Sequence, residues 1–190
     1  MEFVNCQKCD GHYVWRCGTY GYFGGCSNFP KCRSTIKASE LILNFIKLNG
    51  LNLFAWDKEC WKCNNQTKVY SYFLFYELEE LHPMFRCCGG MGLGDIGAFD
   101  NIVMQKYPTI KNQFSHTTKS NCIANSCQKC GALQGYYHVV TDPHEIWNDL
   151  AHNHTMDKYC IENIKADNFD EAFINYLVQE FDKRPEDGEE

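Results

Sequence analysis

Residues 6–32 read CQKCDGHYVWRCGTYGYFGGCSNFPKC, and their cysteine spacing decides how the N-terminal part of this chain folds. Cys6 and Cys9 form a Cys-x2-Cys pair, and Cys26 and Cys32 follow after a stretch rich in glycine and aromatic residues. Four thiolates around one ion make a closed, tetrahedral structural zinc site. A unit this short cannot bury a sufficient core alone, so we expect the ion to hold it together.

The residues between these cysteines resemble the C-terminal four-cysteine zinc ribbon of bacterial type IA DNA topoisomerases. That family follows the pattern R-x-G-x-x-G-x-F-x-G-C-S-x-Y-P-x-C, which this sequence matches at Arg16, Gly18, Gly21, Phe23, Gly25, Cys26, Ser27, Pro30 and Cys32. It differs at Phe29, where the family has Tyr, and at Gln7 and Asp10, where Pro and Gly are common. The resemblance covers about a fifth of the chain, and the remainder shows nothing like the topoisomerase catalytic domains. It implies a nucleic-acid-binding accessory module rather than a strand-passing enzyme.

Six ribbon residues are our candidates for nucleic-acid binding because they combine cations with aromatic rings around one metal hairpin. They are Arg16, Tyr20, Phe23, Phe29, Lys31 and Arg33. So small a core cannot bury all of its rings, which include Trp15 and Tyr22, so we expect several to be exposed. Exposed rings can stack on unpaired bases while cations meet phosphates, which predicts binding to single-stranded DNA. The alternative is that the rings only cover the metal site.

A second metal site is predicted from two further pairs, Cys60-x2-Cys63 and Cys127-x2-Cys130. The chain between them is long, but the entropy of loop closure grows only slowly with length, so one ion can join both pairs. Cys87 and Cys88 compete with the second pair, although adjacent cysteines project in different directions. We therefore expect two structural zinc ions per chain, with iron as the alternative, because tetrahedral thiolate sites accept both.

The remaining cysteines, Cys17, Cys122 and Cys160, are interpreted as buried or spare thiols. Thirteen cysteines in a chain without a signal-peptide pattern favour metal binding over disulfides. The same pattern, and the absence of a long apolar run, predict a cytoplasmic protein that does not enter a membrane.

We expect an α+β fold in four parts: a zinc ribbon at 1–37, a linking helix at 38–50, a second zinc-stabilised α+β domain at 51–182, and a disordered acidic tail at 183–190. Ser39 is expected to cap the linking helix and Gly50 to end it. Within the second domain we predict strands at 68–76 and 132–140, and helices at 95–107, 142–152 and 169–182. In the last helix, Phe169, Phe173, Leu177 and Phe181 recur every four residues, which predicts docking on the core.

Charge is distributed unevenly along the chain. The net charge is −6, yet residues 1–37 carry five basic and two acidic side chains, and residues 157–190 carry four basic and eleven acidic ones. A basic N-terminal part and an acidic C-terminal part are typical of a protein that binds nucleic acid with one end and carries a solvating tail at the other.

Enzymatic functions receive less support from the sequence. GLGDIG at 92–97 matches a dinucleotide-binding pattern but lacks a clear preceding strand, so we interpret it as a turn and helix start. His116, with Asp95 or Asp100 as partner, or the pair His152 and His154, could serve a metal-assisted nuclease. We expect nucleic-acid binding rather than catalysis, with a protein-binding adaptor as the second hypothesis and a nuclease as the third.

Overall fold

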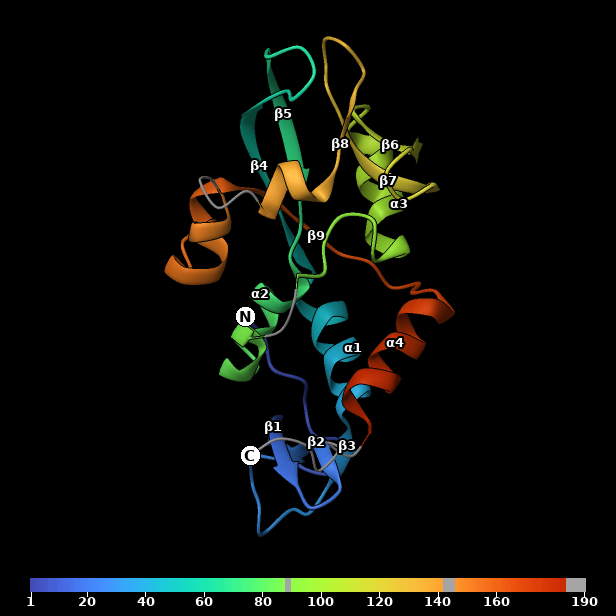
Figure 1. The fold of residues 1–190 in the computed structure, drawn as a ribbon. Coiled ribbons are helices and arrows are strands. Elements are labelled where there is room, and N and C mark those ends of the chain that lie inside the picture. The colour runs from blue at the N-terminus through green and yellow to red at the C-terminus, as the bar shows by residue number, and fades with distance from the viewer. Residues whose placement is uncertain (88–89, 142–145, 184–190) are drawn as a thin grey trace.

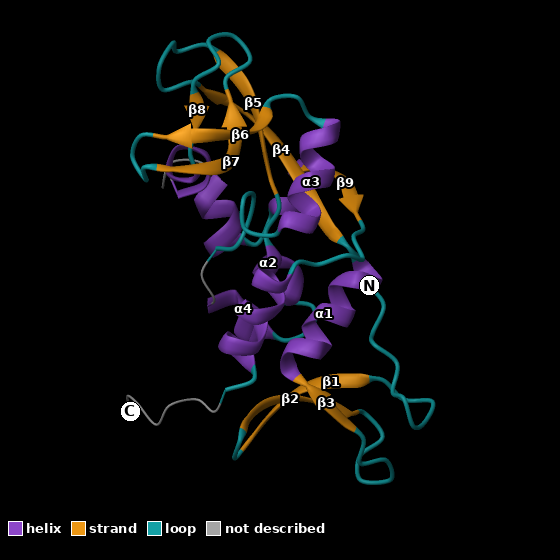
Figure 2. Cartoon of the chain, turned by 90° about the vertical axis from the view of Figure 1, so that its right-hand side faces the viewer, coloured by secondary structure: helices purple, strands orange, loops and turns teal. Residues whose placement is uncertain are grey.

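The structure is a computed structural model that describes residues 1–87, 90–141 and 146–183. The molecule is elongated, with a small sheet at one end, helices in the middle and two further sheets at the other end (Figures 1 and 2). This mixture of helices and sheets, together with two four-cysteine clusters, confirms the predicted α+β fold. The four-part division of the chain stays a prediction, and its tail, from residue 184 on, lies outside the described residues.

The small sheet contains the first four-cysteine cluster. Its antiparallel strands are β1 (Tyr13–Gly18), β2 (Gly21–Cys26) and β3 (Thr35–Lys37), in the order β1-β2-β3. Helix α1 (Ala38–Asn49) follows directly and leads into the middle of the molecule, beside α2 (Leu74–Leu78) and α4 (Glu171–Phe181) (Figure 2).

Two three-stranded antiparallel sheets lie at the opposite end. The first has the order β5-β4-β9, from β4 (Leu51–Glu59), β5 (Gln66–Ser71) and β9 (Cys160–Ile164). The second has the order β6-β7-β8, from β6 (Ile110–Ser115), β7 (Ser120–Ser126) and β8 (Leu133–Gln134). Helix α3 (Gly97–Lys106) precedes β6, and short helical turns occupy Pro83–Cys87, Tyr137–Thr141, Asn148–Asn153 and Met156–Tyr159.

The start of α1 differs from our prediction. The helix begins at Ala38, after Lys37 in extended backbone, so Ser39 lies inside the first turn and does not cap it. Its backbone N–H and hydroxyl instead donate to the two carboxylate oxygens of Asp182, at 2.9 and 2.6 Å. A carboxylate at the end of α4 therefore satisfies a free N–H group of α1 and joins the two helices.

Gly50 ends α1, as predicted, and the structure shows why glycine is needed there. Its φ is 75°, in the left-handed region, and its N–H donates to the carbonyl of Ile46 at 2.8 Å. A side chain at this position would also collide with the carbonyl of Ile164, the residue of β9 that pairs with Leu51 at the end of the β4–β9 ladder. Glycine therefore lets the chain turn sharply from α1 into β4.

The predicted docking of the last helix is confirmed. Phe173, Leu177 and Phe181 are buried in the main apolar core, and Phe169 packs against it half-buried. Asp170 caps this helix by accepting a hydrogen bond from the N–H of Phe173 at 2.8 Å.

Three other predicted elements need correction. The strand expected at 68–76 ends at Ser71 and gives way to α2, because short apolar runs do not distinguish a strand from a buried helix. The strand expected at 132–140 covers only β8, before a helical turn that begins at Tyr137. The helix expected from Asp95 begins at Gly97, since the Asp95 carboxylate accepts from the N–H of Gly92 instead. The start of the helix expected at 142–152 lies outside the described residues.

One buried carboxyl group predicts how stability depends on pH. Burial raises the pKa of Glu77 to about 7, although Asn52 donates to it from both its backbone and its side chain. The folded protein then binds more protons than the unfolded chain between about pH 4.5 and pH 7. The contribution of Glu77 to the free energy of unfolding should therefore fall as the pH rises through this window.

Glu77→Gln should remove this fall. Urea denaturation of both proteins at several pH values would measure it, and the loss of zinc in acid, which affects both proteins, cancels in the difference. Identical pH profiles for the two proteins would contradict the prediction.

Candidate metal centres and nucleic-acid interface

The first centre joins the loop before β1 to the end of β2 and the loop that follows. The Sγ atoms of Cys6 and Cys32 lie 3.8 Å apart, and those of Cys9 and Cys26 lie 3.4 Å apart. All four sulfur atoms lie within 4.8 Å of one another. Zinc bound tetrahedrally at about 2.3 Å from each sulfur would separate the sulfurs by about 3.8 Å. The donor set and its dimensions therefore fit one zinc ion.

Backbone N–H groups point at these sulfurs and stabilise their thiolate form. Lys8 donates to Cys6 and Asn28 donates to Cys26, each at 3.4 Å. The Lys8 N–H lowers the pKa of the Cys6 thiol, which favours the charged form that binds metal.

The second centre brings together two turns that are distant in the sequence. Cys60 and Cys63 lie between β4 and β5, whereas Cys127 and Cys130 lie between β7 and β8. The sulfurs of Cys60 and Cys130, and those of Cys63 and Cys127, are each 3.7 Å apart. The two predicted four-cysteine groups are thus both able to hold zinc. Cys88 and the side chain of Cys87, the competing ligands, lie outside the described residues.

Polar side chains that we had not identified from the sequence hold the two hairpins of this centre together. Asn125, which is buried, accepts from the N–H of Tyr70 at 2.9 Å and donates to its carbonyl at 2.8 Å. Gln134, also buried, donates to Cys60 Sγ at 3.3 Å. The sequence does not reveal such a role for a single polar residue within a strand, because its hydrogen-bond partner lies on another hairpin.

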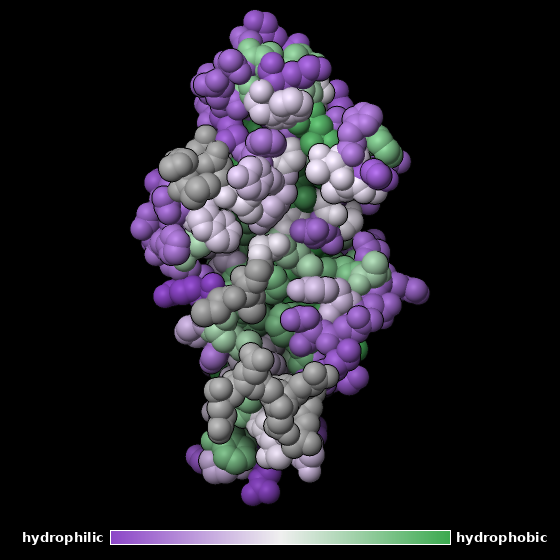
Figure 3. Space-filling model, in the orientation of Figure 1, coloured by the Kyte–Doolittle hydropathy of each residue, from purple (hydrophilic) through white to green (hydrophobic). Residues whose placement is uncertain are grey.

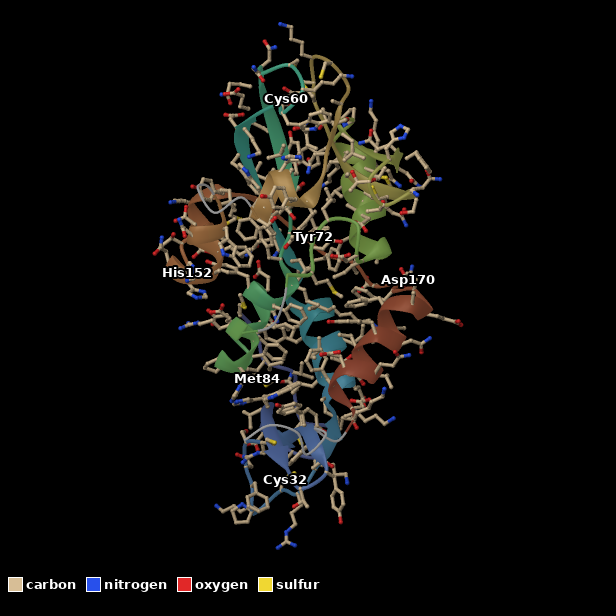
Figure 4. All side chains as sticks on the ribbon, in the orientation of Figure 1. Cys32, Cys60, Tyr72, Met84, His152 and Asp170 are labelled. Carbon is tan, nitrogen blue, oxygen red and sulfur yellow. The ribbon has the colours of Figure 1, made fainter. Side chains whose placement is uncertain are left out.

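Four of the six candidate binding residues line one cavity beside the first centre. The cavity has a volume of about 560 Å³, and the four residues are Arg16, Phe23, Phe29 and Arg33. Phe29 is 60% exposed. Tyr20, which is 86% exposed, lies with Phe23 in a neighbouring cavity, and Lys31 is exposed but lines neither. Figure 4 places Cys32 at this end of the molecule and Cys60 at the other.

Comparison with known proteins identifies the first centre. A family described as "Topoisomerase DNA binding C4 zinc finger" matches residues 4–40. This N-terminal region therefore matches the topoisomerase-type zinc ribbon. The "DNA topoisomerase 1" of Mycoplasmoides gallisepticum is 48% identical over 40 residues, which are 21% of this chain and 6% of the topoisomerase. The likeness thus extends over a small part of either protein, and no solved structure matches the chain significantly.

Arg16 of this topoisomerase-type ribbon lies between the metal centre and Phe29. Its guanidinium carbon is 5.9 Å from the centroid of the Phe29 ring, and its Nη2 donates to the carbonyl of Cys26 at 3.4 Å. A side chain on Gly25 would collide with Arg16, so glycine at this position leaves room for the arginine. The ring and the cation are thereby held side by side at the cavity.

Trp15 is the ring of the ribbon that is buried beyond the ribbon itself. Its ring contacts Tyr22 within the ribbon, and Phe85 and Phe181 outside it, with centroid distances of 5.4, 4.9 and 6.0 Å. The ribbon therefore shares a core with the helices that follow.

The histidines that suggested a nuclease are dispersed. His116 is exposed at the β6–β7 turn, whereas Asp100 is buried and accepts from the hydroxyl of Tyr72 at 2.9 Å. His154 lies 2.9 Å from a carboxylate oxygen of Glu79, and His152 is exposed (Figure 4). In the part of the chain that the structure describes, the only groups of three or more potential metal ligands are the two cysteine clusters. None of the helices described there is long and apolar enough to cross a membrane.

Proposed function

We propose that this protein binds single-stranded DNA through its topoisomerase-type ribbon. The observation that carries the proposal is the cavity beside the first metal centre, which is lined by an exposed aromatic ring and by two arginines. The name of the matching family, which includes DNA binding, supports the same ligand class.

The arrangement suits an unpaired base better than a base pair. Phe29 exposes much of its ring and is held beside Arg16, so a base could stack on it without a large rearrangement of the side chain. Arg16 and Arg33 supply charges for the adjoining phosphates. Bases in a duplex hide their faces, so such a platform favours single strands.

Binding should be modest and sensitive to salt. The whole chain carries a net charge of −6, so the basic ribbon acts against an acidic background. Phosphate contacts release counterions, which makes the affinity fall as the salt concentration rises.

The test uses the full chain with zinc and a labelled single-stranded oligonucleotide, followed by fluorescence anisotropy. Phe29→Ala should weaken binding by about 1–3 kcal/mol, because one stacking platform is lost. Phe29→Tyr, which restores the residue common in the topoisomerases, should retain it. Arg16→Ala should reduce the slope of log affinity against log salt by about one.

The matched control is Val178→Ala, a partly exposed residue on α4 outside the ribbon. Wild-type affinity is expected for this variant. If the wild-type protein binds no oligonucleotide at low salt, the proposal fails and the protein-binding adaptor becomes the leading hypothesis.

A further inference from the structure

We propose that a second face for single-stranded nucleic acid lies beside the second four-cysteine centre, at the end of the molecule opposite the ribbon. This face, which we call the distal face, consists of Trp61, Lys62, Phe114, His116, Tyr137 and His138. These residues come from the Cys60–Cys63 turn, the β6–β7 hairpin and the segment after β8. The proposal is independent of the ribbon, because the two sites share no residue.

The distal face is a hollow lined by exposed rings. Its cavity has a volume of about 700 Å³. Trp61 is 54% exposed, Phe114 is 53% exposed and Tyr137 is 67% exposed. Large aromatic residues are costly to leave in water, so three of them around one hollow indicate a ligand with apolar faces.

Each of the three rings contacts a neighbouring group, including Tyr137, which meets His138 edge-on at 5.5 Å. The indole N–H of Trp61 donates to the carbonyl of Leu133 at 2.6 Å. His138 stacks on Trp61 at a centroid distance of 6.1 Å and an interplanar angle of 19°, and His116 meets Phe114 edge-on at 5.3 Å. Platforms held in this way lose little side-chain entropy when a base stacks on them.

The stretches of chain that supply the distal face are basic, which favours an anionic ligand, and Lys62 lines the cavity itself. Residues 60–76 and 101–141 contain no Asp or Glu, and their six lysines are Lys62, Lys68, Lys106, Lys111, Lys119 and Lys129. Lys68 and Lys106 pair with Asp57 and Glu162, which lie outside these stretches. The remaining four lysines carry four positive charges. The second metal centre, with four thiolates and a divalent ion, has a net charge of about −2, so the lysines outnumber its negative charges.

Together, rings and lysines favour nucleic acid over other partners. Stacking platforms beside cations are the combination by which proteins hold single strands without reading their sequence. A second copy of this chain would bring lysines against lysines, and such like-charge contacts oppose association. Figure 3 shows apolar side chains set among hydrophilic ones at the top of the visible face, the end of the molecule that holds the second centre.

The experiment separates the distal face from the ribbon. The full chain with zinc carries Arg16→Ala and Phe29→Ala to weaken the ribbon site, and is titrated with an oligothymidylate of about ten nucleotides. This background protein should still bind. Adding Phe114→Ala or Tyr137→Ala should weaken the remaining binding by roughly 5- to 150-fold for each ring that carries a base. The indole N–H resonance of Trp61 should shift during the titration.

Controls keep folding apart from binding. Phe114→Tyr and Tyr137→Phe keep a ring and should keep the affinity, and Ile161→Ala, an exposed residue of β9 outside the distal face, should bind as the background does. Unchanged binding after loss of both rings, or resonance shifts confined to the ribbon, would overturn the proposal. So would self-association that Tyr137→Ala abolishes, since the face would then bind a second copy.

Discussion

Replacing Cys127 with serine should remove one zinc ion and unfold most of the far end of the molecule. The second centre joins the turn after β4 to the turn after β7, so its loss separates two hairpins that share the ion. Structural zinc contributes about 10–16 kcal/mol in small zinc-finger peptides, which equals or exceeds the whole stability of a typical domain. Elemental analysis should give one zinc per chain instead of two, and amide exchange should show protection lost throughout β4 to β7.

Cys122→Ser is the matched control for this variant. Cys122 lies on β7, only a few residues before Cys127, and is not part of either four-cysteine group. The control should keep two zinc ions and wild-type protection. Loss of protection confined to the residues around Cys127 would show that the ion does not join the two hairpins.

Trp15→Ala should lower the free energy of unfolding by about 3–5 kcal/mol, the usual cost of removing a large buried ring. The loss of stability should exceed the cost of removing contacts within the ribbon, because Trp15 also contacts Phe85 and Phe181 outside it. Urea denaturation of the zinc-loaded protein measures the change.

Tyr20→Ala provides the comparison on the same ribbon. Tyr20 is almost fully exposed, so its removal should change stability by less than about 0.5 kcal/mol. A similarly small effect for Trp15→Ala would mean that the ribbon and the helices do not share a core.

The two metal centres are the features of this protein that the sequence predicts best. A four-cysteine site needs four ligands at known spacing, so two Cys-x2-Cys pairs can be matched even when the chain between them is long. The docking of α4 was equally accessible, because Phe173, Leu177 and Phe181 follow the period of a helix. In both cases the prediction rests on the spacing of residues along the chain, which can be read without knowing what those residues contact.

Features that depend on a partner could not be predicted. Trp15 is buried by Phe85 and Phe181, which are remote in sequence, so the residues around it did not indicate which of the ribbon's rings would be buried. Strand β6 was missed because the burial of its residues does not alternate regularly. The cavity residues of the ribbon were predicted from a resemblance and from charge, whereas the distal face required knowing that β6 lies beside the Cys60–Cys63 turn.

The contact between Ser39 and Asp182 has a mechanical consequence. It joins the first turn of α1, directly after the small sheet, to the end of α4, and Trp15 of the sheet packs into the same core as these helices. β3 ends at Lys37 and α1 begins at Ala38, so the small sheet continues directly into the helix that leads toward the other end of the molecule. If both proposed faces bind, they lie at opposite ends of an elongated molecule, and only strands long enough to span it can occupy both ends at once.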